Sequence, residues 1–275
     1  MIVPLLKWAG GKRQLRSELT RRLPDRWGTY FEPFIGGGAL LVELANQGRL
    51  GGAVIGDKNP ELVNLYRIVK RDPERLTRAL ADEKFRNDNE SFRQLKTEFN
   101  GLIGTKKRPV DRAALLFYLN KHSYNGLWRV NLKGHYNVPF GKYARLSLPS
   151  HQSLLKFSRM LRSVTLMHAD FERIVRTAKR GDFVYFDPPY HPLSKTARFT
   201  DYTTGGFAFA DQERLARVFH RLSDRGVRLM LSNSSTPEIK KLYDSYSIHT
   251  VAAKRFINCK GEKRGGAFEL IVTNY

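Results

Sequence analysis

Short runs of apolar residues alternate with segments of helical periodicity along most of the chain. Five runs bounded by turn residues predict strands at residues 28–32, 53–56, 163–167, 182–186 and 227–231. Apolar residues at helical spacing predict helices at 39–46, 60–70, 171–178 and 211–222. Near-continuous apolarity in the strands indicates a parallel sheet that is covered on both faces. The pattern therefore predicts an α/β fold, with helices on both faces of a parallel sheet.

Residues 84–145 differ from the rest of the chain because they are basic and rich in aromatic side chains. They hold 13 Lys and Arg against 4 Asp and Glu, a combination that suits phosphate contact and base stacking. Alternatively, these aromatics form the core of a small domain, and we expect about half of them to be buried in this way. Tyr124 and Trp128 are the ones that we expect to be exposed. We also predict a helix at 112–121 and a hairpin at 129–141.

The whole chain is strongly basic. Its 275 residues carry 48 Lys and Arg and 26 Asp and Glu, a formal net charge of +22. Such a field attracts polyanions, so nucleic acid is the expected partner, although a ribosomal or membrane-surface protein would be similarly basic. No apolar run approaches the roughly 18 residues of a membrane span, so we expect a cytoplasmic protein. The single cysteine, Cys259, excludes an internal disulfide, and no Cys and His residues have metal-ligand spacing.

The most specific motif is Asp187-Pro188-Pro189-Tyr190, directly after the strand predicted at 182–186. Enzymes with α/β folds bind ligands at the carboxyl edge of the sheet, so this motif should line a cleft. The exocyclic amine of a base such as adenine is a weak nucleophile because its lone pair is delocalised into the ring. Asp187 and the Pro188 carbonyl can each accept one amine hydrogen, while Tyr190 offers a face to a planar base. The alternative is an incidental strand-to-turn exit.

A glycine-rich segment, residues 31–38 (Phe-Glu-Pro-Phe-Ile-Gly-Gly-Gly), stands between a predicted strand and a predicted helix. Glycines there allow a ligand to approach the backbone and the helix N-terminus. Asp57 follows Gly37 by 20 residues and ends the next strand, where a carboxylate can hold ribose hydroxyls. A dinucleotide enzyme would fit equally well, although the spacing is not Gly-x-Gly-x-x-Gly. Gly10-Gly11-Lys12 lacks the Ser or Thr that completes a P-loop.

Together these motifs resemble the Dam-like DNA adenine methyltransferases, whose elements occur here in the family's order. The matching segments are residues 7–12, 31–38, 124–129, 137–141 and 187–190, with further agreement at 192–194, 199–202 and 231–233. They span most of the chain, although residues 84–108 match no feature of the family. The resemblance implies transfer of a methyl group from S-adenosylmethionine to the 6-amino group of adenine in double-stranded DNA. It further implies the family's usual site, GATC, base flipping and direct in-line transfer.

The resemblance also implies a role for each matching residue. The expected catalytic residues are Asp187, Pro188, Pro189 and Tyr190. The expected cofactor residues are Trp8, Ala9, Gly10 and Lys12 as a clamp, Glu32, Pro33, Phe34, Gly36 and Gly38 beneath the methionine moiety, Asp57 at the ribose, Asp170 and Phe171 at the adenine, and Asp187. The expected DNA contacts are Arg129 and Pro139 on bases, Tyr124, Asn125 and Leu127 in or beside the duplex, and Lys7 on a flanking guanine. No metal is expected.

The implied organisation is a Rossmann-like methyltransferase domain formed by residues 1–63 and 163–275. Residues 64–162 would form an inserted target-recognition domain, mainly helical with a β-hairpin. Residues 191–209, rich in Thr, Gly and aromatics, would close over a flipped base or form an ordinary surface loop. A monomer suffices to methylate one strand at a time, and the setting is expected to be bacterial or viral.

The sequence leaves two other substrates open and argues against three other functions. The same chemistry could act on an RNA adenine or on the amino group of cytosine, which needs the same acceptors. Methylation at carbon 5 of cytosine requires a cysteine after a proline, whereas Cys259 follows Asn258. Protein glutamine methylation is disfavoured because Asp187, not Asn, leads the tetrapeptide. A DNA-binding module without catalysis is disfavoured by the intact motifs.

Overall fold

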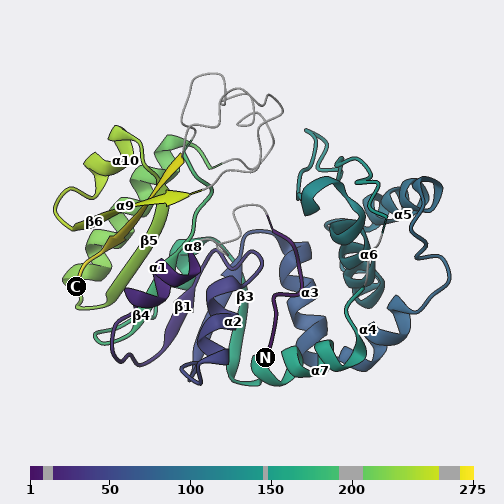
Figure 1. Cartoon of the computed structure of the whole chain (residues 1–275), viewed down its shortest axis with the longest axis horizontal. Coiled ribbons are helices and arrows are strands. Elements are labelled where there is room, and N and C mark those ends of the chain that lie inside the picture. The colour runs from purple at the N-terminus through teal and green to yellow at the C-terminus, as the bar shows by residue number, and fades with distance from the viewer. Residues whose placement is uncertain (9–14, 145–147, 192–206, 254–266) are drawn as a thin grey trace.

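The computed structural model describes residues 1–8, 15–144, 148–191, 207–253 and 267–275. Its seven-stranded sheet has the order β3-β2-β1-β4-β5-β7-β6 (Figure 1). The strands are β1 (Tyr30–Glu32), β2 (Ala53–Asp57), β3 (Val164–His168), β4 (Phe183–Phe186), β5 (Arg228–Ser234), β6 (Ser247–Ala253) and β7 (Ala267–Thr273). Strands β1 to β5 pair in parallel, and β7 runs antiparallel to both β5 and β6. The predicted α/β fold with a parallel Rossmann-like sheet is confirmed.

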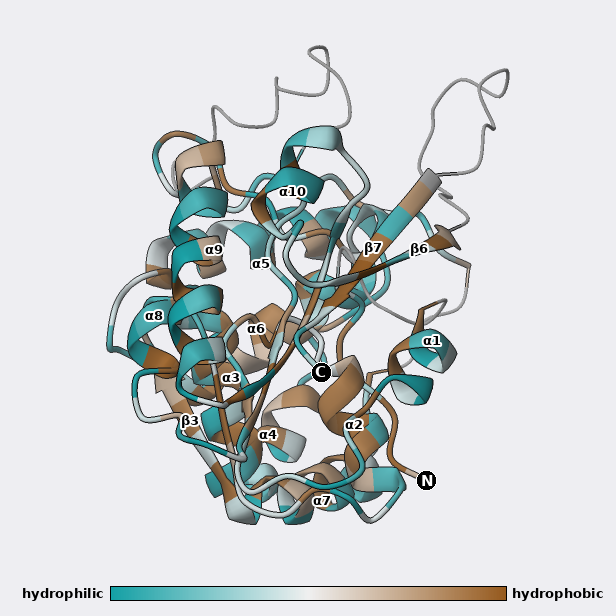
Figure 2. Cartoon of the chain, turned by 90° about the vertical axis from the view of Figure 1, so that its left-hand side faces the viewer, coloured by the Kyte–Doolittle hydropathy of each residue, from teal (hydrophilic) through white to brown (hydrophobic). Residues whose placement is uncertain are grey.

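Helices cover both faces of this sheet because successive strand residues point to opposite sides. Tyr30 of β1 belongs to one buried cluster with α1 (Arg16–Arg21), α2 (Ala39–Asn46) and α3 (Pro60–Arg71). The next residue, Phe31, belongs to a second cluster with α8 (Phe171–Ile174), α9 (Phe209–Asp224) and α10 (Pro237–Leu242). The outer side of α9 is mainly hydrophilic (Figure 2). The sheet is therefore buried on both faces, as its apolar strands predict.

The predicted strands and helices correspond to observed elements, with one helix shortened. The helix predicted at 171–178 ends at Ile174 in α8. Asp182 accepts a hydrogen bond from the Lys179 backbone N–H at 3.0 Å, and Gly181 has a φ of 86°. These contacts form a turn directly before β4, which leaves no room for a longer helix.

Four helices lie between α3 and β3 in the chain, on the right of Figure 1. They are α4 (Pro73–Leu80), α5 (Asn89–Leu102), α6 (Pro109–His122) and α7 (His151–Met160), followed by the short 3-10 helix η2 (Leu161–Ser163). Helix α6 is buried along most of its length and packs against α3, α4 and α5. The helix predicted at 112–121 is thus confirmed. The expected domain boundary after residue 63 falls inside α3, which contacts the sheet as well as α6.

The hairpin predicted at 129–141 forms as a turn with isolated bridges, not as two regular strands. Val130 bridges Tyr136, and Gly134 N–H donates to the Asn131 carbonyl at 2.9 Å. The side chain of Asn100 on α5 accepts from Tyr136 N–H at 2.7 Å and donates to the Tyr136 carbonyl at 3.1 Å. A side-chain amide therefore takes the place of a further neighbouring strand on the outer side of Tyr136.

The aromatics of the inserted segment divide as expected between core and surface, except at one position. Phe92, Phe99, Phe117, Tyr118 and Tyr136 are buried, whereas Tyr124 is 47% exposed. The exposure expected for Trp128 is wrong. Its ring is partly buried because it packs against Phe99 and Tyr136. Among the helices of the described ranges, none combines the length and apolarity that a membrane crossing requires.

Candidate active site

The sheet order reverses between β1 and β4, since β2 and β3 lie on one side of this pair and β5 on the other. Ligands of doubly wound proteins bind at such a point, outside the carboxyl ends of the strands. A cavity of about 1350 Å³ lies there and is lined by residues that follow β1, β2 and β4. Helix α9 and the segment after α6 complete its wall. The topology therefore places the motifs of three separate chain segments around one space.

The tetrapeptide that follows β4 lines this cavity, as predicted. Pro188 is buried, and Asp187 is partly exposed to the cavity. The Tyr190 hydroxyl donates to Glu269 Oε2 on β7 at 2.6 Å. Burial raises the pKa of Tyr190 well above its usual range, and the nearby carboxylates of Asp187 and Glu269 act in the same direction. The phenol therefore stays protonated and keeps its ring in a fixed position.

The glycine segment after β1 forms a tight turn into α2. Gly36 and Gly38 have φ values of 45° and 66°, a region that favours glycine. A Cβ atom on Gly36 would lie 2.8 Å from Cδ1 of Trp8. The Tyr66 hydroxyl holds the Gly36 carbonyl at 3.0 Å. Both the backbone and the approach of the indole thus require glycine at position 36.

Glu32 lines the cavity and is only 2% exposed. Its Oε2 accepts a hydrogen bond from the Tyr30 hydroxyl at 2.8 Å. Burial raises the pKa of Glu32 to about 8, and the proximity of Asp187 adds to this rise, although the hydrogen bond from Tyr30 opposes it. The carboxyl group is therefore mainly protonated at neutral pH in the cofactor-free protein.

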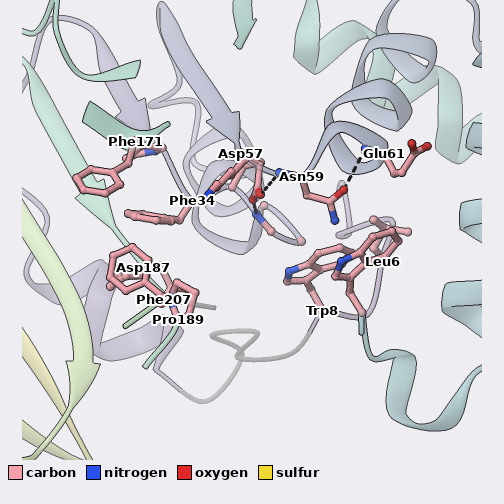
Figure 3. Close-up of a pocket in the computed structure, with 18 of the residues that line it drawn as sticks. Leu6, Trp8, Phe34, Asp57, Asn59, Glu61, Phe171, Asp187, Pro189 and Phe207 are labelled. Atoms are coloured by element: carbon pink, nitrogen blue, oxygen red, sulfur yellow. Dashed lines mark hydrogen bonds between the residues drawn. The ribbon is translucent and has the colours of Figure 1, made fainter. Parts of the chain in front are cut away.

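Asp57 ends β2 and faces the same cavity (Figure 3). One carboxylate oxygen accepts from Asn59 N–H at 2.9 Å, and the other accepts from Gly36 N–H at 3.3 Å. Burial raises the pKa of Asp57 to about 6, while these backbone donors lower it in part. The carboxylate thus joins the β2 end to the glycine turn.

Asp170 and Phe171 begin α8 at the opposite wall. The ring of Phe171 stacks on Phe34 with centroids 5.4 Å apart. Asp170 receives two hydrogen bonds of 2.9 Å from Arg214 on α9. Burial alone would raise the pKa of Asp170, but these bonds and the Glu172 N–H lower it below its usual value. Phe207, which packs edge-on against Phe34, completes an aromatic wall that a flat ring can contact.

Asn59 is a cavity residue that the sequence reasoning missed. Its Oδ1 caps α3 by accepting from Glu61 and Leu62 N–H at 3.0 and 3.3 Å. Its Nδ2 is buried and has no hydrogen-bond partner among the described residues. Figure 3 shows the side chain between Asp57 and Trp8. An Asn-Pro pair does signal a helix cap in sequence, but the unpaired donor becomes visible only in three dimensions. Arg214 was missed as well and lies in no recognisable motif, whereas Phe207 belongs to the aromatic segment 191–209 that the sequence singles out.

The inserted segment, together with Lys7 of the N-terminal segment, contributes the remaining wall, which is basic and aromatic. Lys7, Lys121, Asn125, Trp128 and Lys133 line the cavity. Trp8 stacks on Trp128 with ring centroids 6.2 Å apart and an interplanar angle of 17°. Lys7 is held by Asn120 on α6, whose amide pairs with both its backbone N–H and its carbonyl. The N-terminal segment therefore joins the sheet to α6.

The other residues expected at DNA lie beside the cavity and do not line it. Tyr124 and Arg129 are exposed, and Tyr124 N–H donates to the Pro139 carbonyl at 2.9 Å. The Arg129 guanidinium donates to the side chain and the carbonyl of Asn137, at 2.7 and 3.1 Å. Leu127 is partly buried. Thus only Lys7 and Asn125 of this expected set reach the cavity itself.

Some expected residues lie outside the described ranges. They are Ala9, Gly10 and Lys12 of the clamp, residues 192–206 of the loop after Tyr190, and Cys259. Within those ranges no group of three or more His, Cys, Asp or Glu side chains is placed to hold a metal ion. All the remaining residues expected at the cofactor or the reacting amine line the one cavity.

Comparison with known proteins decides the family. Residues 8–257 match the family described as D12 class N6 adenine-specific DNA methyltransferase. The chain belongs to this family. The resemblance to DNA adenine methyltransferases that the sequence motifs indicate is thereby confirmed, and so is the expectation of an enzyme.

Relatives of this methyltransferase align over nearly its whole length. The type II methyltransferase M1.LlaDCHI of Lactococcus lactis subsp. cremoris is 43% identical over 274 residues, which are 99% of this chain and 95% of the relative. The type II methyltransferase M.MjaIII of Methanocaldococcus jannaschii is 41% identical over 287 residues, with coverage of 100% and 99%. The DNA adenine methylase of Escherichia coli strain K12 is 34% identical over 269 residues, with coverage of 97% and 93%.

Membership of a methyltransferase family implies a cofactor of the S-adenosylmethionine type, and the cavity fits such a group. It offers a glycine turn that a ligand can approach, an aromatic wall at Phe34, Phe171 and Phe207, and a carboxylate at Asp57. The buried, unpaired Nδ2 of Asn59 is a donor that a polar ligand can satisfy. The adenine-specific methyltransferase thus has a site of suitable chemistry beside the Asp187–Tyr190 motif.

Proposed function

We propose that this methyltransferase transfers a methyl group from S-adenosylmethionine to the 6-amino group of adenine in double-stranded DNA, with GATC as the expected site. The observation that carries the proposal is the convergence of the Asp187–Tyr190 motif and the glycine turn after β1 on one cavity. One motif suits a base amine, and the other suits a nucleoside cofactor. Their shared space allows donor and acceptor to meet.

The amine is activated by position and hydrogen bonding. Asp187 and the Pro188 carbonyl each accept one amine hydrogen, which favours a pyramidal nitrogen whose lone pair points at the methyl donor. Tyr190 holds the base by stacking, and its ring is itself held by Glu269. The cofactor supplies a methyl group on a positively charged sulfur. As the amine nitrogen bonds to the methyl carbon, the carbon–sulfur bond would break and the sulfur would leave as a neutral thioether. The nitrogen returns to neutrality by losing one proton, which the Asp187 carboxylate accepts and passes to solvent.

The remaining cavity residues bind the cofactor and shape its site. Asp57 faces the ribose, and Phe34 with Phe171 faces the adenine ring. Glu32, Pro33, Gly36 and Gly38 surround the methionine part, and Trp8, Ala9, Gly10 and Lys12 cover it. The Asp170 carboxylate is already bonded by Arg214, so Asp170 contributes to the cofactor site mainly by capping α8 and positioning Phe171. Each assignment rests on the motif and, for the described residues, on the cavity lining.

An adenine inside a duplex cannot reach this cavity, so we propose that the base is flipped out. Residues 64–162 serve as the target-recognition domain and residues 1–63 and 163–275 as the catalytic domain. Arg129 and Pro139 read bases, Tyr124, Asn125 and Leu127 fill or orient the opened duplex, and Lys7 contacts a flanking guanine. To read a base, the Arg129 guanidinium must give up its hydrogen bond to Asn137 and donate to a base edge instead. Such a bidentate contact is worth about 1–3 kcal/mol of discrimination against the wrong base.

The enzyme is proposed to act as a monomer in the cytoplasm of a bacterium or on phage DNA. One relative is the DNA N-6-adenine-methyltransferase of Escherichia phage P1, which is 32% identical over 97% of this chain. Relatives named as type II methyltransferases make a restriction partner a second possibility for the biological setting.

The direct test is transfer of labelled methyl from S-adenosylmethionine to unmethylated plasmid DNA, followed by nucleoside analysis and digestion with enzymes that sense GATC methylation. N6-methyladenine together with GATC protection is the expected result. Methyladenine without protection would retain the chemistry and reject the site. Label in RNA or in methylcytosine would reject the substrate.

The variant Asp187→Ala tests the amine-acceptor role. We expect its turnover to fall at least about 100-fold, because the amine loses its charged acceptor, while its affinity for duplex DNA stays within about twofold. The checks are single-turnover methylation and fluorescence anisotropy of labelled DNA. Methylation at the normal rate would mean that Asp187 does not accept the amine hydrogen.

A further inference from the structure

The backbone around Tyr190 is held from behind by two buried amide side chains. Gln212 on α9 and Asn233 on β5 are both 0% exposed. Gln212 Nε2 donates to the Pro189 carbonyl at 2.9 Å, and Asn233 Nδ2 donates to Gln212 Oε1 at 2.9 Å. Asn233 Oδ1 accepts from the N–H groups of Ser234 and His191, at 2.8 and 3.5 Å. Neither amide belongs to the cavity lining.

The direction of every hydrogen bond in this relay is fixed at both ends by backbone groups. The Pro189 carbonyl can only accept, so the amino group of Gln212 must face it and its oxygen must face Asn233. The backbone N–H groups of Ser234 and His191 can only donate, so the oxygen of Asn233 must face them. Flipping either amide would leave buried polar groups without a hydrogen-bond partner, and each such group costs about 1–3 kcal/mol of stability. The relay therefore has a single arrangement.

We propose that Gln212 and Asn233 are positioning residues for methyl transfer, an inference that rests on the proposed function. They bond the carbonyl before Tyr190 and the N–H after it, so both peptide planes that flank the stacking residue are fixed. Gln212 also occupies the Pro189 carbonyl, which leaves the Pro188 carbonyl as the backbone acceptor for the amine. Glu269 fixes the Tyr190 ring from β7. Three separate elements thus hold the catalytic motif.

The test uses Gln212→Glu and Asn233→Asp in the full chain. Each substitution keeps size and shape but removes an amino group, so a carboxylate oxygen faces the Pro189 carbonyl in the first variant and the Gln212 oxygen in the second. We expect kcat to fall about 10- to 100-fold, because small displacements at a reacting centre have effects of that order. KM for DNA and the Kd of S-adenosylmethionine should change less than twofold. Gln47→Glu, the same change at an exposed position at the end of α2 and outside the inserted segment, should leave all three values unchanged.

Further measurements separate positioning from simple loss of fold. The double variant should lose hardly more kcat than either single variant, because one broken link already releases the motif. If Gln212→Glu fails to fold, Gln212→Met keeps the volume, removes the donor and should show the same loss of kcat. Normal kcat in a folded variant would overturn the proposal, and so would a loss confined to cofactor affinity. Inactivity of the unsubstituted enzyme on DNA would instead reject the proposed function.

Discussion

Glu32 and Asp57 are two acids of the cavity whose pKa values rise for the same reason, because burial disfavours their charged forms. They differ in their partners. Glu32 accepts from a tyrosine hydroxyl, whereas Asp57 accepts from backbone N–H groups. Near neutral pH in the cofactor-free protein, Glu32 is therefore mainly neutral and Asp57 mainly ionised. One charged and one uncharged carboxyl group thus line the same cavity.

The variant Glu32→Gln should change how stability depends on pH. A carboxyl with a raised pKa binds more protons in the folded chain, so the free energy of unfolding decreases as pH rises between the two pKa values. For Glu32 this window runs from about 4.5 to about 8. Glutamine removes the titration and still accepts from Tyr30. In urea unfolding without cofactor at pH 8–9, we expect the free energy of unfolding of the variant to exceed that of the unsubstituted protein by about 1 kcal/mol or more.

The same comparison should show no clear difference near pH 4.5, where Glu32 is protonated in the folded protein. Asp57 titrates in both proteins, so its contribution cancels. Glu213→Gln, at an exposed position on α9, serves as the control and should leave the pH profile unchanged. A constant offset between Glu32→Gln and the unsubstituted protein at every pH would contradict the raised pKa.

Individual residues could be predicted where they belong to a motif. Asp187 and Asp57 lie in recognisable places after predicted strands, and both line the cavity. Gln212, Glu269 and Arg214 could not be found in this way. Their contacts join segments that lie 23, 79 and 44 residues apart, and polar residues of this kind on a helix or strand usually face solvent. Only the packing of α9 and β7 onto the sheet gives them partners.

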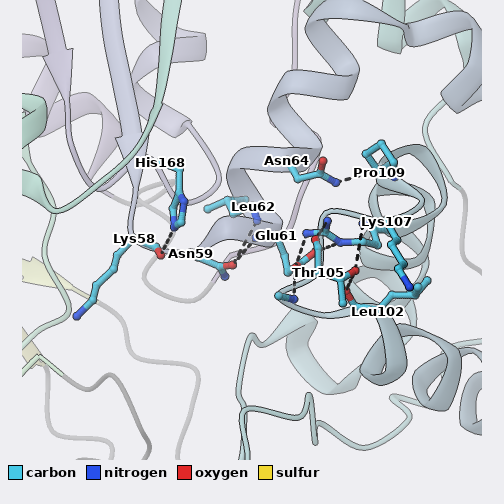
Figure 4. A network of polar contacts seen from close by, with 12 residues as sticks. Lys58, Asn59, Glu61, Leu62, Asn64, Leu102, Thr105, Lys107, Pro109 and His168 are labelled. Carbon is cyan, nitrogen blue, oxygen red and sulfur yellow. Dashed lines mark hydrogen bonds and ion pairs between the residues drawn. The ribbon is translucent and has the colours of Figure 1, made fainter.

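Among the elements, the first turn of α3 joins the Asp57 side of the cavity to the inserted helices (Figure 4). Glu61 and Arg112 form a buried ion pair between α3 and α6, with hydrogen bonds of 2.6 and 2.9 Å. Glu61 also accepts from Gly104 N–H at 2.9 Å. Two residues earlier, Asn59 caps the same helix. The orientation of α6 is thus linked to the end of β2.

Removing one partner of this pair should be costly. Arg112→Met leaves the Glu61 carboxylate buried without its cation, and we expect a loss of about 3–5 kcal/mol in the free energy of unfolding. The double variant Glu61→Leu with Arg112→Met should recover much of that loss, because no charge remains buried. Arg75→Met breaks an exposed pair with Asp72 and should cost at most about 1 kcal/mol. Guanidinium unfolding measures the free energy of unfolding of all three variants. Equal losses for Arg112→Met and Arg75→Met would mean that the buried pair matters no more than the exposed one.

The apolar strands and amphipathic helices were predictable elements, but the antiparallel edge was not. Strands β1, β2 and β4 are short and almost continuously apolar because both faces of the sheet centre are buried. At the edge, β6 includes polar residues such as His249 and Thr250, so its sequence has no strong strand signal. It forms a strand because β7, which is itself paired with β5, provides an edge for it to join.

At the scale of the whole molecule, the excess of positive charge should govern DNA affinity. Lys133 is exposed at the cavity wall that the inserted segment provides. We expect Lys133→Gln to weaken binding to all duplex sequences alike and to reduce the slope of log Kd against log salt concentration by about 1. Arg78→Gln on α4 removes an equally exposed charge away from the cavity and should leave the slope unchanged. DNA titrations at several salt concentrations give the slope for each variant. Equal changes of slope in Lys133→Gln and Arg78→Gln would mean that DNA does not bind preferentially at the cavity wall.

A single hydrophobic cluster runs from Tyr30 on β1 through Leu65 on α3 to Phe117 on α6. The inserted helices therefore have no core of their own that is separate from the sheet. The helical segment of this chain is therefore not a self-contained unit, and its replacement would require matching changes in α3. The proposed DNA contacts Tyr124 and Arg129 lie at exposed positions instead, where substitutions leave the shared core intact.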